Sequence, residues 1–390
     1  MRETLGRIFR ISLREIGIMR RNPIYGFCTI IFPILVIIFF TTLLNEGQPS
    51  NMPVGIVDQD NTQTTRSMIR QLDAFQASRV VAHYNNVNEA RKAIQRNEIY
   101  AFLLIPQGTT SELMAQKQPK ISLYYSNISI VAGSTLYKDL MTITSLGSAG
   151  VSATKLAAVG KTNKEIQAFL QPIALDTHMV NNPWADYNVY LTTSMASGVL
   201  MIFIFLLTPY AIGTEIKFRR SRQWVKMAGG NMHIALIGKL LPQTLIFLTI
   251  MYGYAFYIFH VLQFPHPGGV FPILLLGLLA VLATQGFGVF AFGLMPSLRM
   301  SMSVCSLWAV LGFSLCGATF PIFAMDSPIQ SIAQLFPMRH FYMIYQMTIF
   351  NGFPITNAWF NIMALIIFIC LPVFTVYNIK KAMLVYVYIP

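Results

Sequence analysis

The sequence predicts a polytopic α-helical membrane protein with six transmembrane helices and an extracytoplasmic α/β domain inserted between the first two. Three observations predict this class. The 390-residue chain is 54% hydrophobic and 11% charged, with a mean hydropathy of +0.54, whereas a soluble domain carries about 25% charged residues. The apolar residues gather in six long runs, and a long polar segment separates the first run from the second.

The N-terminal segment, residues 1–22, is expected to be an amphipathic helix on the cytoplasmic surface of the membrane. Its apolar residues share one helical face and its arginines share the other, and Asn22-Pro23 ends it. Residues 23–44 form the first span, because the chain from Tyr25 onward carries no charge over about the length that crosses the hydrocarbon. A cleaved signal peptide is disfavoured, since this apolar run is too long and lacks a cleavage site of small residues.

The polar segment, residues 45–188, alternates short apolar runs with helical patterns. Strands are expected at residues 54–57, 80–84, 100–105 and 121–125, and helices at residues 62–75, 87–96 and within 134–170. This alternation indicates a small α/β domain with a partly parallel sheet.

Five more apolar runs predict the remaining spans, at residues 190–212, 234–260, 271–295, 302–323 and 358–377. The polar segment holds 12 basic and 11 acidic residues, so nearly all of the net charge of +13 lies elsewhere. The basic clusters fall on one side of the membrane when the chain is threaded with a cytoplasmic N-terminus. The positive-inside rule then predicts cytoplasmic termini and an extracytoplasmic polar segment. The charge therefore marks membrane orientation, and no nucleic acid is expected as a partner.

Residues 324–357 are too interrupted by proline and charge to span, yet too apolar for a free loop. Two short re-entrant helices in the outer leaflet are expected here, packed against protein.

The basic segment at residues 213–232 lies between the second and third spans. It suits a short amphipathic helix on which another protein pushes. A positive-inside loop without a partner is the alternative. Its acid, Glu215, is expected either in a buried polar contact or in a pair with Arg219 four residues on. The residues expected to carry the contact are Glu215, Arg219, Arg220, Arg222, Trp224 and Met227.

No catalytic, cofactor-binding or metal-binding residues are predicted. Gly160-Lys161-Thr162 lacks the first glycine of a phosphate loop. Residues 58–61 start like a calcium loop but lack its later ligands, and helix capping is the better interpretation. The six runs contain no Asp or Glu, which disfavours transport coupled to an ion, since such carriers place ionisable groups at mid-membrane.

Four stretches resemble the permease subunit of an ABC-2 type ATP-binding cassette exporter, in its multidrug-efflux-like branch with a large outer domain. They are LREIGIMRRNPIYGFCTIIFPILVIIFF at the start, VGIVDQDNTQTTRSMIRQLDAF with AFLLIPQG and residues 180–183 in the polar segment, EIKFRRSRQWVKMAGGNMHIALIGKLLP, and GATFPIFAMDSPIQSIAQLFPMRHFYMIYQ. The resemblance covers nearly the whole chain.

The resemblance implies a permease that moves an amphipathic or hydrophobic substrate outward across the bacterial cell membrane, which is the inner membrane in Gram-negative cells. ATP would be bound and hydrolysed by a cytosolic ATP-binding cassette ATPase, so this chain would be no enzyme and need no cofactor. The other partners implied are a second permease subunit, identical or a paralogue, membrane lipid and, as an open alternative, a periplasmic adaptor. Two other functions stay open, a membrane-anchored protein that binds a ligand or partner without transport, and an ion-coupled carrier.

Overall fold

The chain divides into two units, one formed by Met1–Asn45 with Val180–Pro390 and one by Glu46–Met179. The computed structural model describes residues 2–115, 117–172, 178, 181–182 and 185–386. The unit formed by Met1–Asn45 with Val180–Pro390 is called the helical unit, and the unit formed by Glu46–Met179 is called the sheet unit. The resemblance at residues 180–183 falls partly outside the described residues.

The helical unit begins with α1 (Arg2–Arg21), α2 (Pro23–Gly26), η1 (Phe27–Ile31) and α3 (Phe32–Leu43). After the sheet unit come η2 (Asn188–Thr192), α9 (Thr193–Lys217), α10 (Ser221–Met227), α11 (Met232–Phe256), η3 (Tyr257–Val261), α12 (Val270–Leu294) and α13 (Leu298–Ser314). The chain ends with η4 (Ile322–Ala324), α14 (Ser327–Ala333), α15 (Pro337–Ile344), η5 (Tyr345–Phe350), η6 (Ile355–Ala358), α16 (Trp359–Cys370) and α17 (Pro372–Val385).

Five helical stretches of the described residues are long and apolar enough to cross a membrane, so this is a polytopic α-helical membrane protein. They are Pro23–Leu43, Asn188–Lys217, Met232–Val261, Val270–Leu294 and Ile355–Val385. The run predicted at residues 302–323 corresponds to a shorter apolar helix, α13, which begins earlier and ends at Ser314. A sixth span therefore stays a prediction.

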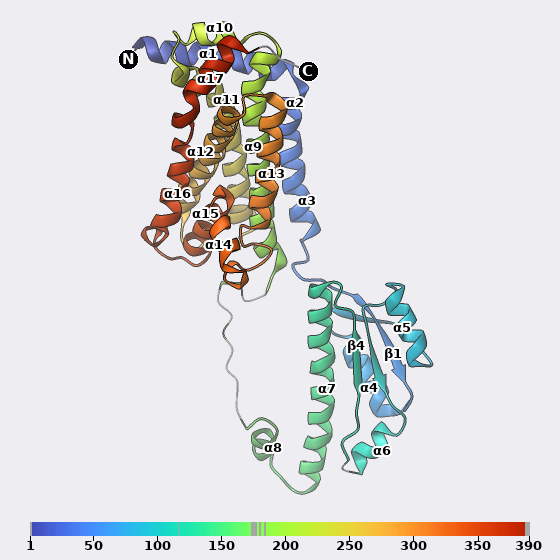
Figure 1. Ribbon diagram of the computed structural model, residues 1–390. Coiled ribbons are helices and arrows are strands. Elements are labelled where there is room, and N and C mark those ends of the chain that lie inside the picture. Colours follow the sequence, from blue (N-terminus) through green and yellow to red (C-terminus); the bar gives the residue numbers. More distant parts are fainter. Residues whose placement is uncertain (1, 116, 173–177, 179–180, 183–184, 387–390) are drawn as a thin grey trace. The chain divides into compact units, whose positions relative to one another are not determined.

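The two ends of the helical unit differ in the elements they carry. α1 and α10 lie at one end together with the end of α17, and α14 and α15 lie at the opposite end (Figure 1). These are called the α10 end and the α14 end. Between them, α9 and α12 bury most of their residues in a common core. The two short helices expected within residues 324–357 correspond to α14 and α15, and their insertion into the membrane stays a prediction.

The sheet unit contains four strands, β1 (Met52–Asp58), β2 (Ser78–His83), β3 (Ala101–Ile105) and β4 (Ser122–Tyr125), at the positions that the periodicity predicts. Their order is β2-β1-β3-β4, with β1 parallel to β2 and β3, and β4 antiparallel to β3. The helices are α4 (Gln63–Asp73), α5 (Val87–Gln95), α6 (Thr109–Met114), α7 (Ile130–Ala158) and α8 (Asn163–Leu170).

Alternation along the strands sends side chains to two separate cores. Ile56 and Leu103 pack with Leu72 of α4 and Leu140 of α7 on one face. On the other face, α5 packs against Val57 and Phe102. Helices therefore cover both faces, as is usual where strands are parallel.

The polar motifs of the sheet unit act structurally. Thr62 caps α4, while the Asp58 carboxylate accepts the backbone N–H groups of Asp60 and Asn61. The Asp60 carboxylate accepts N–H groups at the start of α6. Burial raises the pKa of Asp60, but its hydrogen bonds outweigh this effect and the pKa lies below its usual value. Gly160 and its neighbours form the turn between α7 and α8.

Candidate functional site

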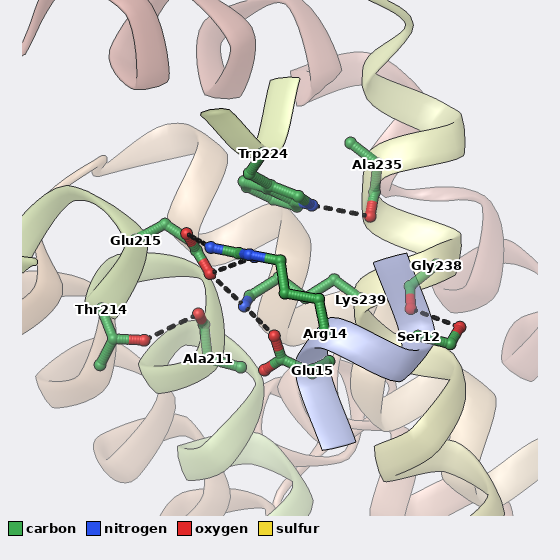
Figure 2. A network of polar contacts seen from close by, with 10 residues as sticks. All are labelled: Ser12, Arg14, Glu15, Ala211, Thr214, Glu215, Trp224, Ala235, Gly238 and Lys239. Atoms are coloured by element: carbon green, nitrogen blue, oxygen red, sulfur yellow. Dashed lines mark hydrogen bonds and ion pairs between the residues drawn. The ribbon is translucent and has the colours of Figure 1, made fainter. Parts of the chain in front are cut away.

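A buried network of charged groups joins three helices at the α10 end (Figure 2). Lys239 of α11 places its Nζ 2.6 Å from Glu15 Oε2 of α1 and 2.8 Å from Glu215 Oε1 of α9. Arg14 of α1 donates two hydrogen bonds to the same Glu215, one of 3.0 Å from Nη1 to Oε1 and one of 2.7 Å from Nη2 to Oε2. This bidentate geometry is the strong form of an arginine–carboxylate pair.

The four groups form a balanced set with two negative and two positive charges. The Glu215 side chain is 0% exposed, and Glu15 and Lys239 are each 1% exposed. Removing such groups from water costs several kcal/mol per ion, so each charge depends on its partners. The network therefore fixes α1, α9 and α11 relative to one another, and removing one charge leaves its partner buried and unbalanced.

The backbones of α1 and α11 lie close together at Gly238. The Ser12 hydroxyl donates a hydrogen bond of 2.8 Å to the carbonyl of Gly238, the residue before Lys239. A Cβ atom on Gly238 would lie 2.9 Å from the Ile11 Cβ and 3.1 Å from the Ile8 carbonyl oxygen. Only glycine therefore lets α1 lie close enough to α11 for Glu15 to meet Lys239.

We expect Gly238→Val to force α1 off α11 and to destabilise the protein by about 1–3 kcal/mol, the usual cost of overpacking. Gly253→Val is the matched control, because it makes the same change on the same helix where no atom lies within 4 Å of the added Cβ. Thermal unfolding in detergent measures both variants. Equal melting temperatures for the two would contradict the close contact.

Trp224 anchors α10 above the network. Its side chain is 0% exposed, and its indole N–H donates a 3.2 Å hydrogen bond to the Ala235 carbonyl on α11. The Lys239 Nζ lies 5.3 Å from the centre of the Trp224 ring, within range of a cation–π interaction. Trp224 therefore connects α10 to α11 and to the lysine that pairs with the two carboxylates.

The basic segment is two helices with a sharp turn between them, and not one continuous helix from Glu215 to Met227. α9 runs on to Lys217 and so carries Glu215, and Arg219 adopts a left-handed backbone with φ of 55° before α10 begins at Ser221. Phe218 is 53% exposed in this turn, and the Arg220 guanidinium lies 5.0 Å from its ring centre.

The predicted site residues separate into two groups. Arg219 and Arg222 are exposed, and Arg220 and Met227 are partly buried, so these four line or border the surface of the α10 end. Glu215 and Trp224 are buried and contact no solvent. Glu215 makes the expected buried polar contact, and it pairs with Arg14 and Lys239, which rules out Arg219 as its partner in the structure.

Sequence reasoning missed Arg14 and Lys239 as partners of Glu215, and it missed Glu15 as the second acid that Lys239 pairs with. One local signal was present, because Glu15 shares a helical face with Ile11, Ser12 and Met19, the residues that α1 buries. An acid on the buried face of an amphipathic helix requires a cation in the structure that the helix contacts. In the described residues, no group of histidine, cysteine or acidic side chains has the arrangement of a metal site.

The fold and this network define a class, an integral membrane protein whose long helices are tied together at one end by buried charges. The particular family follows from comparison with known proteins. The chain belongs to the ABC-2 transporter family, since the model described as "ABC-2 family transporter protein" matches residues 24–377. The resemblance to ABC-2 permeases is thereby confirmed, and the chain is a membrane permease subunit. The multidrug-efflux-like branch with its large outer domain stays a prediction.

A similar protein is the linearmycin resistance permease protein LnrN of Bacillus subtilis (strain 168). It is 21% identical over 346 residues, which cover 85% of this chain and 88% of LnrN. ABC-2 permeases are transport components without their own nucleotide site, and they work with a cytosolic ATPase.

Proposed function

We propose that this permease subunit exports an amphipathic or hydrophobic substrate, using ATP that separate cytosolic ATPase subunits hydrolyse. Family membership supports the division of labour between permease and ATPase. The name of LnrN, a resistance permease, supports export of a compound that is harmful inside the cell.

The proposed orientation places the α10 end and both termini in the cytoplasm and residues 45–188 outside the bacterial cell membrane. The positive-inside rule supports it, because the exposed arginines of α1 and α10 gather at the α10 end. α13 completes six spans in this proposal. Its 17 residues extend about 25 Å at 1.5 Å per residue, slightly less than the hydrocarbon thickness.

The buried network beneath α10 is the observation that carries the proposal. The ATPase docks on Arg219, Arg220, Arg222 and Met227, and its movement is passed through Trp224 to Lys239. The ion pairs of Lys239 connect that movement to Glu215 on α9 and to Glu15 on α1. Three helices then tilt together, which is a rigid-body route to opening an outward path.

The proposal needs further partners. A second permease subunit, identical or a paralogue, would complete the path, and a periplasmic adaptor would engage the sheet unit. An ion-coupled carrier is disfavoured, because each buried carboxylate of the network is already paired with a cation of the protein.

Affinity purification of the full chain in mild detergent, followed by mass spectrometry, tests the division of labour. We expect a nucleotide-binding chain in a fixed ratio to the permease, together with ATP hydrolysis. A permease that purifies without such a chain and still drives transport after reconstitution would refute the proposal.

A further inference from the structure

Arg339 is a buried cation at the α14 end, far along the chain from the network just described. It lies in the first turn of α15 and is 6% exposed. Its Nε and Nη1 atoms are buried, and neither finds a hydrogen-bond partner within the described part of the chain. Both nitrogens carry N–H donors, and a guanidinium with unused donors is suited to hydrogen-bonding a carboxylate or phosphate.

The sequence supplies almost no acid to balance Arg339. Between residue 216 and the C-terminus the one acidic residue is Asp326, which is exposed at the start of α14. No ion pair among the described residues includes Arg339. The Cys316 thiol interacts electrostatically with Arg339, but a buried thiol stays uncharged, because burial disfavours the charged thiolate.

The buried cation Lys239 differs from Arg339, because two carboxylates of the protein pair with it. A buried charge without a partner is strongly unfavourable. The N-terminus of α15 adds its own partial positive charge at the same place. Both features favour an anion that comes from outside the described residues.

The end of the helical unit that carries Arg339 also presents apolar side chains that suit a ligand with an apolar part. Large apolar side chains are exposed on α14 and on the segments that flank it, namely Phe320, Phe323, Ile329, Ile332 and Leu335. α14 and α15 lie at the same end of the helical unit (Figure 1). We propose that Arg339 binds the phosphate or carboxylate group of an amphiphile whose apolar tail lies against α14.

α14 and the chain before it are suited to admitting such a molecule. α14 buries Ala333 alone among its residues, and residues 315–321 form neither helix nor strand. Few buried contacts mean a low free energy of local opening. This inference deepens the proposed export function, because it names a class of cargo, the anionic amphiphiles. The assignment of the bound molecule as cargo rests on that proposed function. The binding test needs no ATPase, so amphiphile binding at Arg339 and ATP-driven export can each fail without the other.

The test uses the purified full chain in dodecyl maltoside, a neutral detergent, with dodecyl phosphate, laurate and inorganic phosphate as probes. Binding is measured by native mass spectrometry and by the rise in melting temperature. We expect the wild type to bind both anionic amphiphiles, and Arg339→Gln to bind them about tenfold or more weakly, since charged hydrogen bonds are lost. Arg339→Lys should retain part of the affinity. Arg299→Gln, which removes an exposed arginine of α13, should bind as the wild type does.

Without added amphiphile, Arg339→Gln should melt no lower than the wild type, because it removes an unbalanced buried charge. A markedly lower melting temperature would show that an acid of the protein or of a second copy already pairs with Arg339, and would overturn the proposal. Unchanged amphiphile binding by Arg339→Gln would overturn it as well. If inorganic phosphate bound as tightly as dodecyl phosphate, the apolar tail would contribute nothing to binding, and the proposal of an amphiphile would be overturned.

Discussion

Replacing Lys239 with Met is expected to cost about 3–5 kcal/mol of stability, the usual consequence of removing one partner from a buried ion pair. The substitution keeps the volume of the side chain but leaves Glu15 without a cation and Glu215 with Arg14 alone. Thermal unfolding of the purified chain, or its recovery as a single species on size exclusion, measures the loss.

A second substitution separates charge imbalance from loss of packing. Glu15→Gln combined with Lys239→Met leaves the balanced pair of Arg14 and Glu215, so the double variant should recover most of the lost stability. Lys226→Met on the exposed face of α10 is the control and should melt as the wild type does. A double variant less stable than Lys239→Met would show that the four groups do not act as one set.

Replacing Arg219, Arg220 and Arg222 with alanine is expected to lower the amount of co-purifying ATPase at least tenfold while the permease itself stays folded. Arg219 and Arg222 are exposed, so their loss removes attraction for a partner without opening the core. Charge complementarity of this kind governs encounter and specificity. The ratio of ATPase to permease after purification in mild detergent is the readout.

The matched control removes the same number of charges from the sheet unit, through Arg70, Arg79 and Arg91, which are also exposed. It should leave the ATPase ratio unchanged. Should both triple variants lose the ATPase equally, net charge and not the α10 surface would govern the association. An unchanged ratio in the α10 variant would place the docking surface elsewhere.

Patterns of short range predicted much of the fold. Strand alternation and turn residues located all four strands of the sheet unit, and uncharged runs located the five long helices. α13 was harder, because Gly317 and Pro321 end regular helix soon after Ser314 while the composition stays apolar. Hydropathy alone records composition and does not register such a break.

The site was predicted only where a local rule applied. Glu215 stood out as one acid among five bases, but its partners Arg14 and Lys239 lie 201 and 24 positions away. Pairing over such separations depends on how α1 packs on α11, which no periodicity reveals. Trp224 was predicted to contact a partner protein, but it is buried. Helical spacing does not show which face of α10 packs on the other helices.

Side-specific labelling tests most directly whether the α10 end faces the compartment that holds the ATPase. Single cysteines replace Arg222 on α10 and Lys92 on α5, both exposed, after the four native cysteines have been changed to serine or alanine. A membrane-impermeant maleimide should label the Lys92 position in intact spheroplasts and the Arg222 position only after permeabilisation. Labelling of the Arg222 position in intact spheroplasts would contradict the account.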